Sequence, residues 1–104
     1  MENTKQFLVE LWAFGSNGQT RREVDVPVAM ADAATIPNLL DLIFRLGQND
    51  FQVKPIRSVS SGDVIFLGDG SRWLVLAVGF KQLDPAAYEA YAKLSDAERM
   101  KTIW

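Results

Sequence analysis

The sequence of 104 residues predicts one α+β domain, in which two β-hairpins form an antiparallel or mixed sheet packed by a central helix. Three observations predict this class. Apolar, β-prone runs lie on both sides of Asp69-Gly70, an amphipathic helical pattern runs from Ile36 to Gly47, and a second helical stretch follows Asp84-Pro85. A strand-turn-strand-helix opening is also compatible with a β-grasp arrangement.

The central hairpin is the strongest local signal. Val64 to Leu67 and Trp73 to Val78 are its two strands, and Asp-Gly between them supplies residues that tolerate the positive φ of a tight turn. Neither run alternates apolar with polar residues, so both faces of each strand are expected to be covered. The hairpin is therefore predicted at the centre of the sheet, with a subunit interface as the alternative.

The N-terminal third predicts the other hairpin. Lys5 to Phe14 alternates, with one apolar face and a second face on which Glu10 is the single charge among large apolar side chains. Gly15 to Gln19 is a turn cluster, and Arg21 to Val28 pairs back on the first strand. The charged outer face and Pro27 of this second strand favour an edge position.

Met30 to Ala34 is predicted to be a linker or a short helical turn. Thr35 can cap the helix that follows, and Pro37 fits its first turn. The apolar residues recur at steps of three and four, and Gly47 is a natural end. The predicted buried stripe is Ile36, Leu39, Leu40, Ile43 and Leu46.

The remaining segments connect and close the domain. Asp50 to Ile56 is predicted to be extended, and Gly79 and Phe80 to close the central hairpin. Asp84-Pro85 is a helix start, with strong helix formers up to Leu94. Ser95 to Glu98 fits a capping box, which predicts a second short helix towards Trp104.

Composition excludes several kinds of chemistry. The chain has no cysteine and no histidine, which removes disulfides, thiol nucleophiles, imidazole acid–base catalysis and the usual zinc sites. The net charge of -2 gives no overall attraction to nucleic acid or to an anionic membrane. The N-terminus lacks a signal-peptide pattern, and no apolar run approaches the roughly 20 residues of a membrane span. We expect a cytoplasmic protein without a cofactor, a metal or a membrane partner.

A further pattern occupies the central stretch: S-V-S-S-G-D-V-I, a gap containing D-G, and an aromatic-containing strand that ends V-G-F. With the helix before it, this pattern resembles the small YodL-like domains of bacterial mobile elements, over Thr35 to Leu83. Leu74 replaces the second residue of the family's aromatic pair. The resemblance implies a plasmid, phage or integrative-element context and implies no reaction. The matching positions are Ser58, Ser60, Asp63, Val64, Leu67, Gly70, Trp73, Gly79 and Phe80.

Two carboxylates lie inside this pattern. Asp63 and Asp69 are of the type that holds Mg²⁺ or transfers protons, so an enzyme using Asp63 and a metal is one hypothesis. Asp69 precedes glycine in a turn, and Asp63 follows Gly62 where a side chain would cap the turn entering the strand. We interpret both as structural. The hydroxyls of Ser58, Ser60 and Ser61 are likewise expected to bond to the turn backbone.

The leading hypothesis is a non-enzymatic protein-binding accessory or modulator, with an unknown protein partner or a second copy as a homodimer. Its interaction candidates are Trp12, Phe14, Trp73, Phe80, Tyr88 and Trp104. The alternative is a nucleic-acid-binding module that uses a local basic and aromatic patch. Its candidate residues are Arg21, Arg22, Lys54, Arg57 and Arg72.

Overall fold

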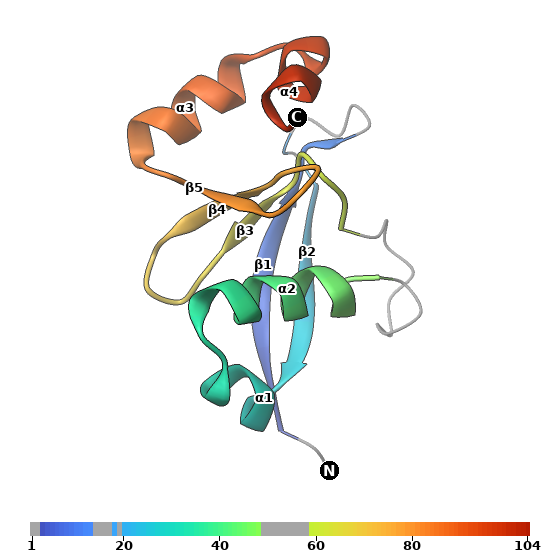
Figure 1. The fold of residues 1–104 in the computed structure, drawn as a ribbon, viewed down its shortest axis with the longest axis vertical. Coiled ribbons are helices and arrows are strands. Elements are labelled where there is room, and N and C mark those ends of the chain that lie inside the picture. The colour runs from blue at the N-terminus through green and yellow to red at the C-terminus, as the bar shows by residue number, and fades with distance from the viewer. Residues whose placement is uncertain (1–2, 14–17, 19, 49–58) are drawn as a thin grey trace.

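The computed structural model describes residues 3–13, 18, 20–48 and 59–104 (Figure 1). The chain begins with strands β1 (Thr4–Leu11) and β2 (Thr20–Pro27), followed by helices α1 (Val28–Ala33) and α2 (Ile36–Leu46). Strands β3 (Val64–Phe66), β4 (Arg72–Val75) and β5 (Phe80–Leu83) come next, and helices α3 (Pro85–Lys93) and α4 (Asp96–Thr102) end the chain.

The strands form one five-stranded sheet in the order β2-β1-β3-β4-β5, in which each neighbouring pair is antiparallel. The predicted α+β class is confirmed, and of the two sheet types expected, the antiparallel one is formed. A β-grasp sheet needs parallel neighbours at its centre, and the described strands contain no parallel pair. The β-grasp suggestion is therefore wrong.

Helices cover both faces of the sheet (Figure 1). On one face, Ile65 and Val75 pack with α2 in a cluster that includes Leu40 and Ile43. On the other face, Val64 and Leu74 pack with α3 and the end of α4. These four strand residues are at most 2% exposed. The central, doubly covered position predicted for the hairpin is confirmed, and the chain's own helices provide the cover.

The first hairpin is long and regular. Its register runs from Thr4 opposite Pro27 to Leu11 opposite Thr20. β2 lies at the edge of the sheet, as its charged face and Pro27 predicted. The chain enters α1 directly after Pro27, so the segment expected to be a linker or a helical turn is a short helix.

The second half of the sheet differs from the prediction. The strand expected over Trp73 to Val78 ends at Val75, and the chain turns again before β5 pairs back on β4 with Val75 opposite Phe80. Leu76 N–H donates to Gly79 O at 3.0 Å across this turn, and Gly79 takes a φ of 83° that favours glycine. Phe80 therefore begins a fifth strand and does not close the central hairpin.

The helix ends follow the sequence signals closely. Asp84 accepts a hydrogen bond from Ala87 N–H at 2.7 Å, and Ser95 with Glu98 forms the predicted capping box. Thr35 precedes α2 but makes no capping hydrogen bond through its side chain. Within the predicted stripe of α2, Ile36 is the exception, because 44% of it is exposed.

Two further points complete the fold. The segment from Asp50 to Ile56, predicted to be extended, lies outside the described residues. No helix in the described part of the chain is long and apolar enough to cross a membrane.

Candidate functional site

Asp63 is completely buried, and its carboxylate accepts hydrogen bonds from backbone N–H groups. Oδ1 accepts hydrogen bonds from Trp12 N–H at 2.8 Å and Ala13 N–H at 2.9 Å, and Oδ2 accepts from Ser60 N–H at 2.8 Å. Gly62, just before it, has a φ of 102°. The carboxylate therefore joins the end of β1 to the turn that enters β3, which is the structural role that its sequence context predicts.

Asp69 is an exposed turn residue. Its Oδ1 accepts hydrogen bonds from Ser71 N–H at 2.9 Å and from the Ser71 hydroxyl at 2.6 Å. The Ser71 hydroxyl is the main reason that the pKa of Asp69 is lowered, so this carboxylate stays ionised. Among the described residues, no group of three acidic side chains is placed to hold a metal ion.

A second buried carboxylate belongs to Glu10, of which 2% is exposed. Oε1 accepts hydrogen bonds from Trp12 Nε1–H at 3.2 Å and from the Tyr88 hydroxyl, and Oε2 is ion-paired with Arg21 at 3.0 Å. The guanidinium of Arg72 lies 4.4 Å from the centre of the Tyr88 ring. This polar cluster ties α3 to three strands of the sheet.

The Tyr88 hydroxyl is a poor proton donor to solvent. Burial is the largest cause and the hydrogen bond to Glu10 the next, and together they raise the pKa of Tyr88 to about 12. Since each Glu10 oxygen already has a donor, the cluster holds the helix in place and has no free base to offer a substrate.

Arg99 organises the opposite end of the same face. It is 6% exposed, its Nη1 donates to Leu94 O, and its Nη2 donates to Asp96 at 2.6 Å. Its guanidinium lies 4.9 Å from the centre of the Trp12 ring. Tyr91 packs edge-on against Trp12, and burial raises the pKa of Tyr91 to about 12. Arg99 thus fastens α4 to α3 and to the end of β1.

A hollow of about 270 Å³ lies beside this anchor. Trp12 lines it just after the end of β1, Tyr91 lines it from α3, and Ala97 and Met100 line it from α4. Its polar edge is formed by Arg99 and Asp96, which are bonded to each other. The hollow is therefore an apolar depression without a free acid, base or nucleophile among those side chains.

Large apolar side chains are exposed near this hollow. Val78 is 90% exposed, Trp104 is 86% exposed and Met100 is 47% exposed. Ala77 N–H donates to Ile103 O at 2.8 Å, which brings the β4–β5 turn against the end of α4, as the C-terminal end in Figure 1 also shows. We call Val78, Met100 and Trp104 the C-terminal apolar surface.

The six predicted interaction residues occupy very different environments. Trp12 is 8% exposed and belongs to the core between the sheet and α3. Trp73 and Phe80 are half-buried against the cluster under α2, and Tyr88 is half-buried beside Glu10. Trp104 is freely exposed, and Phe14 lies outside the described residues.

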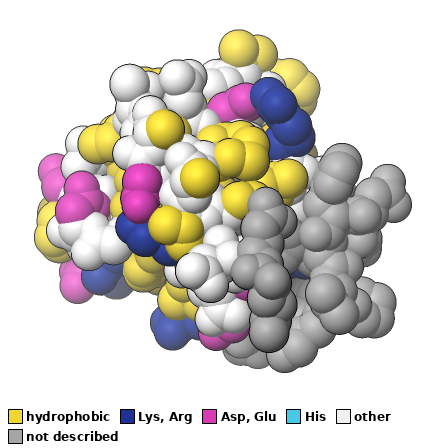
Figure 2. All heavy atoms as spheres, turned by 90° about the horizontal axis from the view of Figure 1, so that it is seen from below, with side chains coloured by type: hydrophobic (Ala, Val, Ile, Leu, Met, Phe, Trp, Pro, Cys, Tyr) yellow, Lys and Arg dark blue, Asp and Glu magenta, His cyan; other side chains and the backbone are white. Residues whose placement is uncertain are grey.

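The three predicted basic residues that the structure describes do not all lie on one face of the sheet. Arg21 is bonded to Glu10, and Arg72 lies over the ring of Tyr88. Arg22 is 2% exposed and lies opposite Val9 in the β1–β2 register, so its side chain is on the sheet face covered by α2. Lys54 and Arg57 lie outside the described residues. Figure 2, seen from the α1 end, shows acidic and basic side chains interspersed with apolar ones.

Sequence reasoning missed the roles of Glu10 and Arg99. Glu10 carried a signal, because it is the single charge on a strand face between Leu8 and Trp12. Arg99 carried none, since an arginine in the second turn of a capped helix normally faces water.

Comparison of the chain with family models, with curated proteins and with solved structures found no match. The resemblance of the central stretch to YodL-like domains stays a prediction.

Proposed function

We propose that this protein is a non-enzymatic protein-binding module that uses its C-terminal apolar surface. One observation carries the proposal: Val78 and Trp104 are nearly fully exposed, and each follows a member of the hydrogen-bonded pair Ala77 and Ile103. Large apolar side chains that are exposed close to one another favour a protein interface.

The fold gives Val78 and Trp104 no packing role. The adjacent Ile103 is 4% exposed and fills the core beneath α3, so it is the residue that anchors this end of the chain. Turn positions such as that of Val78 normally hold polar residues or glycine. Tryptophan is also among the residues that contribute most to binding energy in protein interfaces. These properties favour recognition over stability as the reason for the two side chains.

The neighbouring hollow supports the same function. Its volume of about 270 Å³ is below the roughly 300–1,000 Å³ of pockets that bind small molecules. An apolar hollow of this size suits one anchoring side chain of a protein partner. Met100 lines the hollow and is itself half-exposed, so the hollow adjoins the C-terminal apolar surface.

The buried polar groups support a non-enzymatic role. Asp63 is held by backbone N–H groups, and Glu10 is held by a tryptophan, a tyrosine and an arginine. General acid–base catalysis needs a group whose pKa lies near the working pH, whereas both tyrosines have a pKa of about 12.

The nucleic-acid alternative has less support. Arg21 is engaged by Glu10, Arg72 lies over Tyr88, and Arg22 is buried on the opposite face. A single-stranded oligonucleotide titration at low salt distinguishes the two functions, because phosphate contacts would give binding that weakens steeply as salt rises.

The biological setting is a separate part of the proposal. A role as an accessory or modulator encoded by a plasmid, a phage or another mobile element is supported by the YodL-like pattern of the central stretch alone. The genes beside this one in its source genome test that setting.

Affinity capture from the native host tests the proposed function. Wild-type protein is compared with the paired variant Val78→Ser/Trp104→Ser and with Met30→Ser, which removes a side chain of 46% exposure from α1. We expect proteins that are retained by wild type and by Met30→Ser and are lost with the paired variant. Identical captured sets for all three would contradict the proposal. Light scattering on the purified proteins shows whether the partner is a second copy.

A further inference from the structure

The two central strands of the sheet have unequal lengths. β1 has eight residues, whereas β3 has three and pairs only with Leu8–Glu10 of β1. The first half of β1, from Thr4 to Phe7, has β2 on one side. On its other side no described strand pairs with it, and Figure 1 shows this half of β1 extending past the end of β3.

The backbone groups on that open side can be identified from the β1–β2 register. Val28 N–H donates to Asn3 O at 3.0 Å, so the main-chain groups of Asn3 point towards β2. Successive residues of an antiparallel strand point their main-chain groups to opposite sides. The N–H and C=O groups of Thr4 and Gln6 therefore point to the open side. They alternate with residues that bond to β2, as the pairing groups of an antiparallel strand do.

A groove of about 660 Å³ runs along this edge. Lys5 and Phe7 line it together with Gln6 and Leu8, which belong to the opposite sheet face, so the groove opens onto the strand edge itself. Ile36 and Leu39 of α2 form an apolar wall. This explains why Ile36 belongs to the predicted apolar stripe and yet is 44% exposed.

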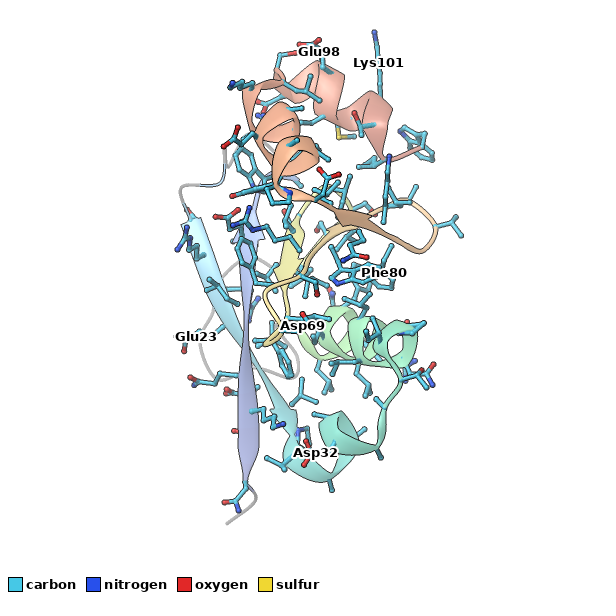
Figure 3. All side chains as sticks on the ribbon, turned by 90° about the vertical axis from the view of Figure 1, so that its left-hand side faces the viewer. Glu23, Asp32, Asp69, Phe80, Glu98 and Lys101 are labelled. Atoms are coloured by element: carbon cyan, nitrogen blue, oxygen red, sulfur yellow. The ribbon has the colours of Figure 1, made fainter. Side chains whose placement is uncertain are left out.

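The charges around the groove favour a basic ligand. Lys5 Nζ is bonded to Asp32 at 2.7 Å, so that cation is already neutralised. Asp69 lines the groove from the β3–β4 turn and stays ionised because of its bonds to Ser71. Figure 3 shows Asp32 on α1 and Asp69 on that turn, beside α2.

We propose that this groove binds an extended segment of another protein, which adds a strand beside Thr4–Phe7. The segment places an aliphatic side chain against Ile36 and Leu39 and a lysine or arginine near Asp69. Main-chain hydrogen bonds supply affinity in this mode of recognition, and pockets for alternate side chains supply specificity. The N–H and C=O groups of Thr4 and Gln6 continue the row of groups through which β1 pairs with β3. A strand is the element whose main chain can pair with such a row. The proposal is independent of the C-terminal apolar surface.

Gln6→Pro tests the main-chain contact selectively. Proline removes the N–H group of residue 6, and this group points into the groove. The N–H groups that bond β1 to β2 belong to other residues and are retained. Gln6→Ala is the matched control, because it shortens the side chain and keeps the N–H. Ile36→Asp tests the apolar wall by placing a charge in it.

The probe is a displayed library of random octapeptides, selected against the folded full-length chain. We expect the selected peptides to have an alternating pattern of side chains that includes an aliphatic residue and a lysine or arginine. Their binding should shift the NMR amide signals of Thr4, Gln6 and Ile36. Gln6→Pro should weaken binding about three- to tenfold, the loss of one hydrogen bond. Gln6→Ala should bind within about twofold of wild type, since the main-chain donor remains.

Several results would overturn the proposal: no enriched peptide, shifts confined to other residues, or equal binding by Gln6→Pro. Concentration-dependent self-association that Gln6→Pro abolishes would show a second copy as the occupant instead. If Gln6→Pro does not fold, the wild-type protein is tested with two versions of a selected peptide, N-methylated at the odd or at the even residues. One version must lose the N–H groups that pair with β1, so undiminished binding of both would contradict the proposal. Val78→Ser/Trp104→Ser should bind the peptides as wild type does, which separates this groove from the C-terminal apolar surface.

Discussion

The carboxylate of Asp63 accepts a hydrogen bond from the backbone N–H of Trp12, 51 residues earlier in the chain, at 2.8 Å. Asp63 is completely buried, and Trp12 is 8% exposed. The bond joins the exit of β1 to the entrance of β3. It also positions the Trp12 ring, which supports Tyr91 and Arg99 and therefore α4.

Asp63→Asn is expected to destabilise the protein. The amide group retains one oxygen and turns an N–H₂ towards backbone donors, so at least one buried N–H loses its acceptor. The free energy of unfolding should fall by about 2–4 kcal/mol. Urea unfolding followed by circular dichroism measures this, with Asp69→Asn in the exposed turn as the control, expected to change stability much less. Equal effects of the two substitutions would contradict the buried role of Asp63.

Both tyrosines of the chain should titrate late. An unfolded tyrosine has a pKa of about 10, and in the fold burial raises the pKa of Tyr88 and of Tyr91 to about 12. The folded state thus retains both protons above the pH at which the unfolded chain loses them. The stability that they contribute is complete below pH 10 and is lost as the pH rises from about 10 to 12. Ultraviolet titration of tyrosinate measures this, and one tyrosine ionising near pH 10 in the folded protein would be inconsistent with it.

Glu10→Gln should act on one tyrosine only. Glu10 raises the pKa of Tyr88 through a hydrogen bond and through its charge, so its neutral replacement lowers that pKa towards the ordinary value. The same titration in a Tyr91→Phe background follows Tyr88 alone. A Tyr88 pKa that does not move would show that Glu10 and Tyr88 are not bonded in solution.

Arg99→Lys is expected to loosen α4 although it keeps the charge. Lysine cannot reproduce the planar contact over Trp12 or the simultaneous bonds to Leu94 O and Asp96. The loss should be about 2–3 kcal/mol, with faster hydrogen exchange in α4. Lys101→Ala on the exposed side of the same helix is the control, with a change within about 0.5 kcal/mol. Wild-type exchange rates in Arg99→Lys would argue against this anchor.

The fold was predictable where one local signal decided the structure. Asp69-Gly70 identified the β3–β4 turn, and Asp84 and Ser95 marked the starts of two helices. The unbroken apolar runs correctly indicated strands that are covered on both faces. In each case the residues concerned favour one backbone conformation or one environment strongly.

β5 could not be predicted from the same signals. The turn before it has Ala77 and Val78 where polar residues are usual, so the apolar run continued without a break up to Gly79. The strand itself, F-K-Q-L, is short and does not alternate. Its conformation is set by pairing with β4, which is a tertiary contact.

The candidate site was predictable only in part. Trp104 was among the expected interaction residues and is exposed. Trp12 was a candidate of the protein-binding hypothesis and Arg22 of the nucleic-acid hypothesis, and both are buried. Residue type alone does not distinguish these cases, because burial depends on which strand face meets a helix. The open edge of β1 follows from the unequal lengths of β1 and β3, which the sequence did not reveal.

Equilibrium urea unfolding of Val78→Ser/Trp104→Ser tests most directly whether the C-terminal apolar surface serves binding and not folding. Because both side chains are almost fully exposed, the free energy of unfolding should stay within about 0.5 kcal/mol of wild type. A loss of about 2 kcal/mol or more would place these side chains in the core and contradict their role as a binding surface.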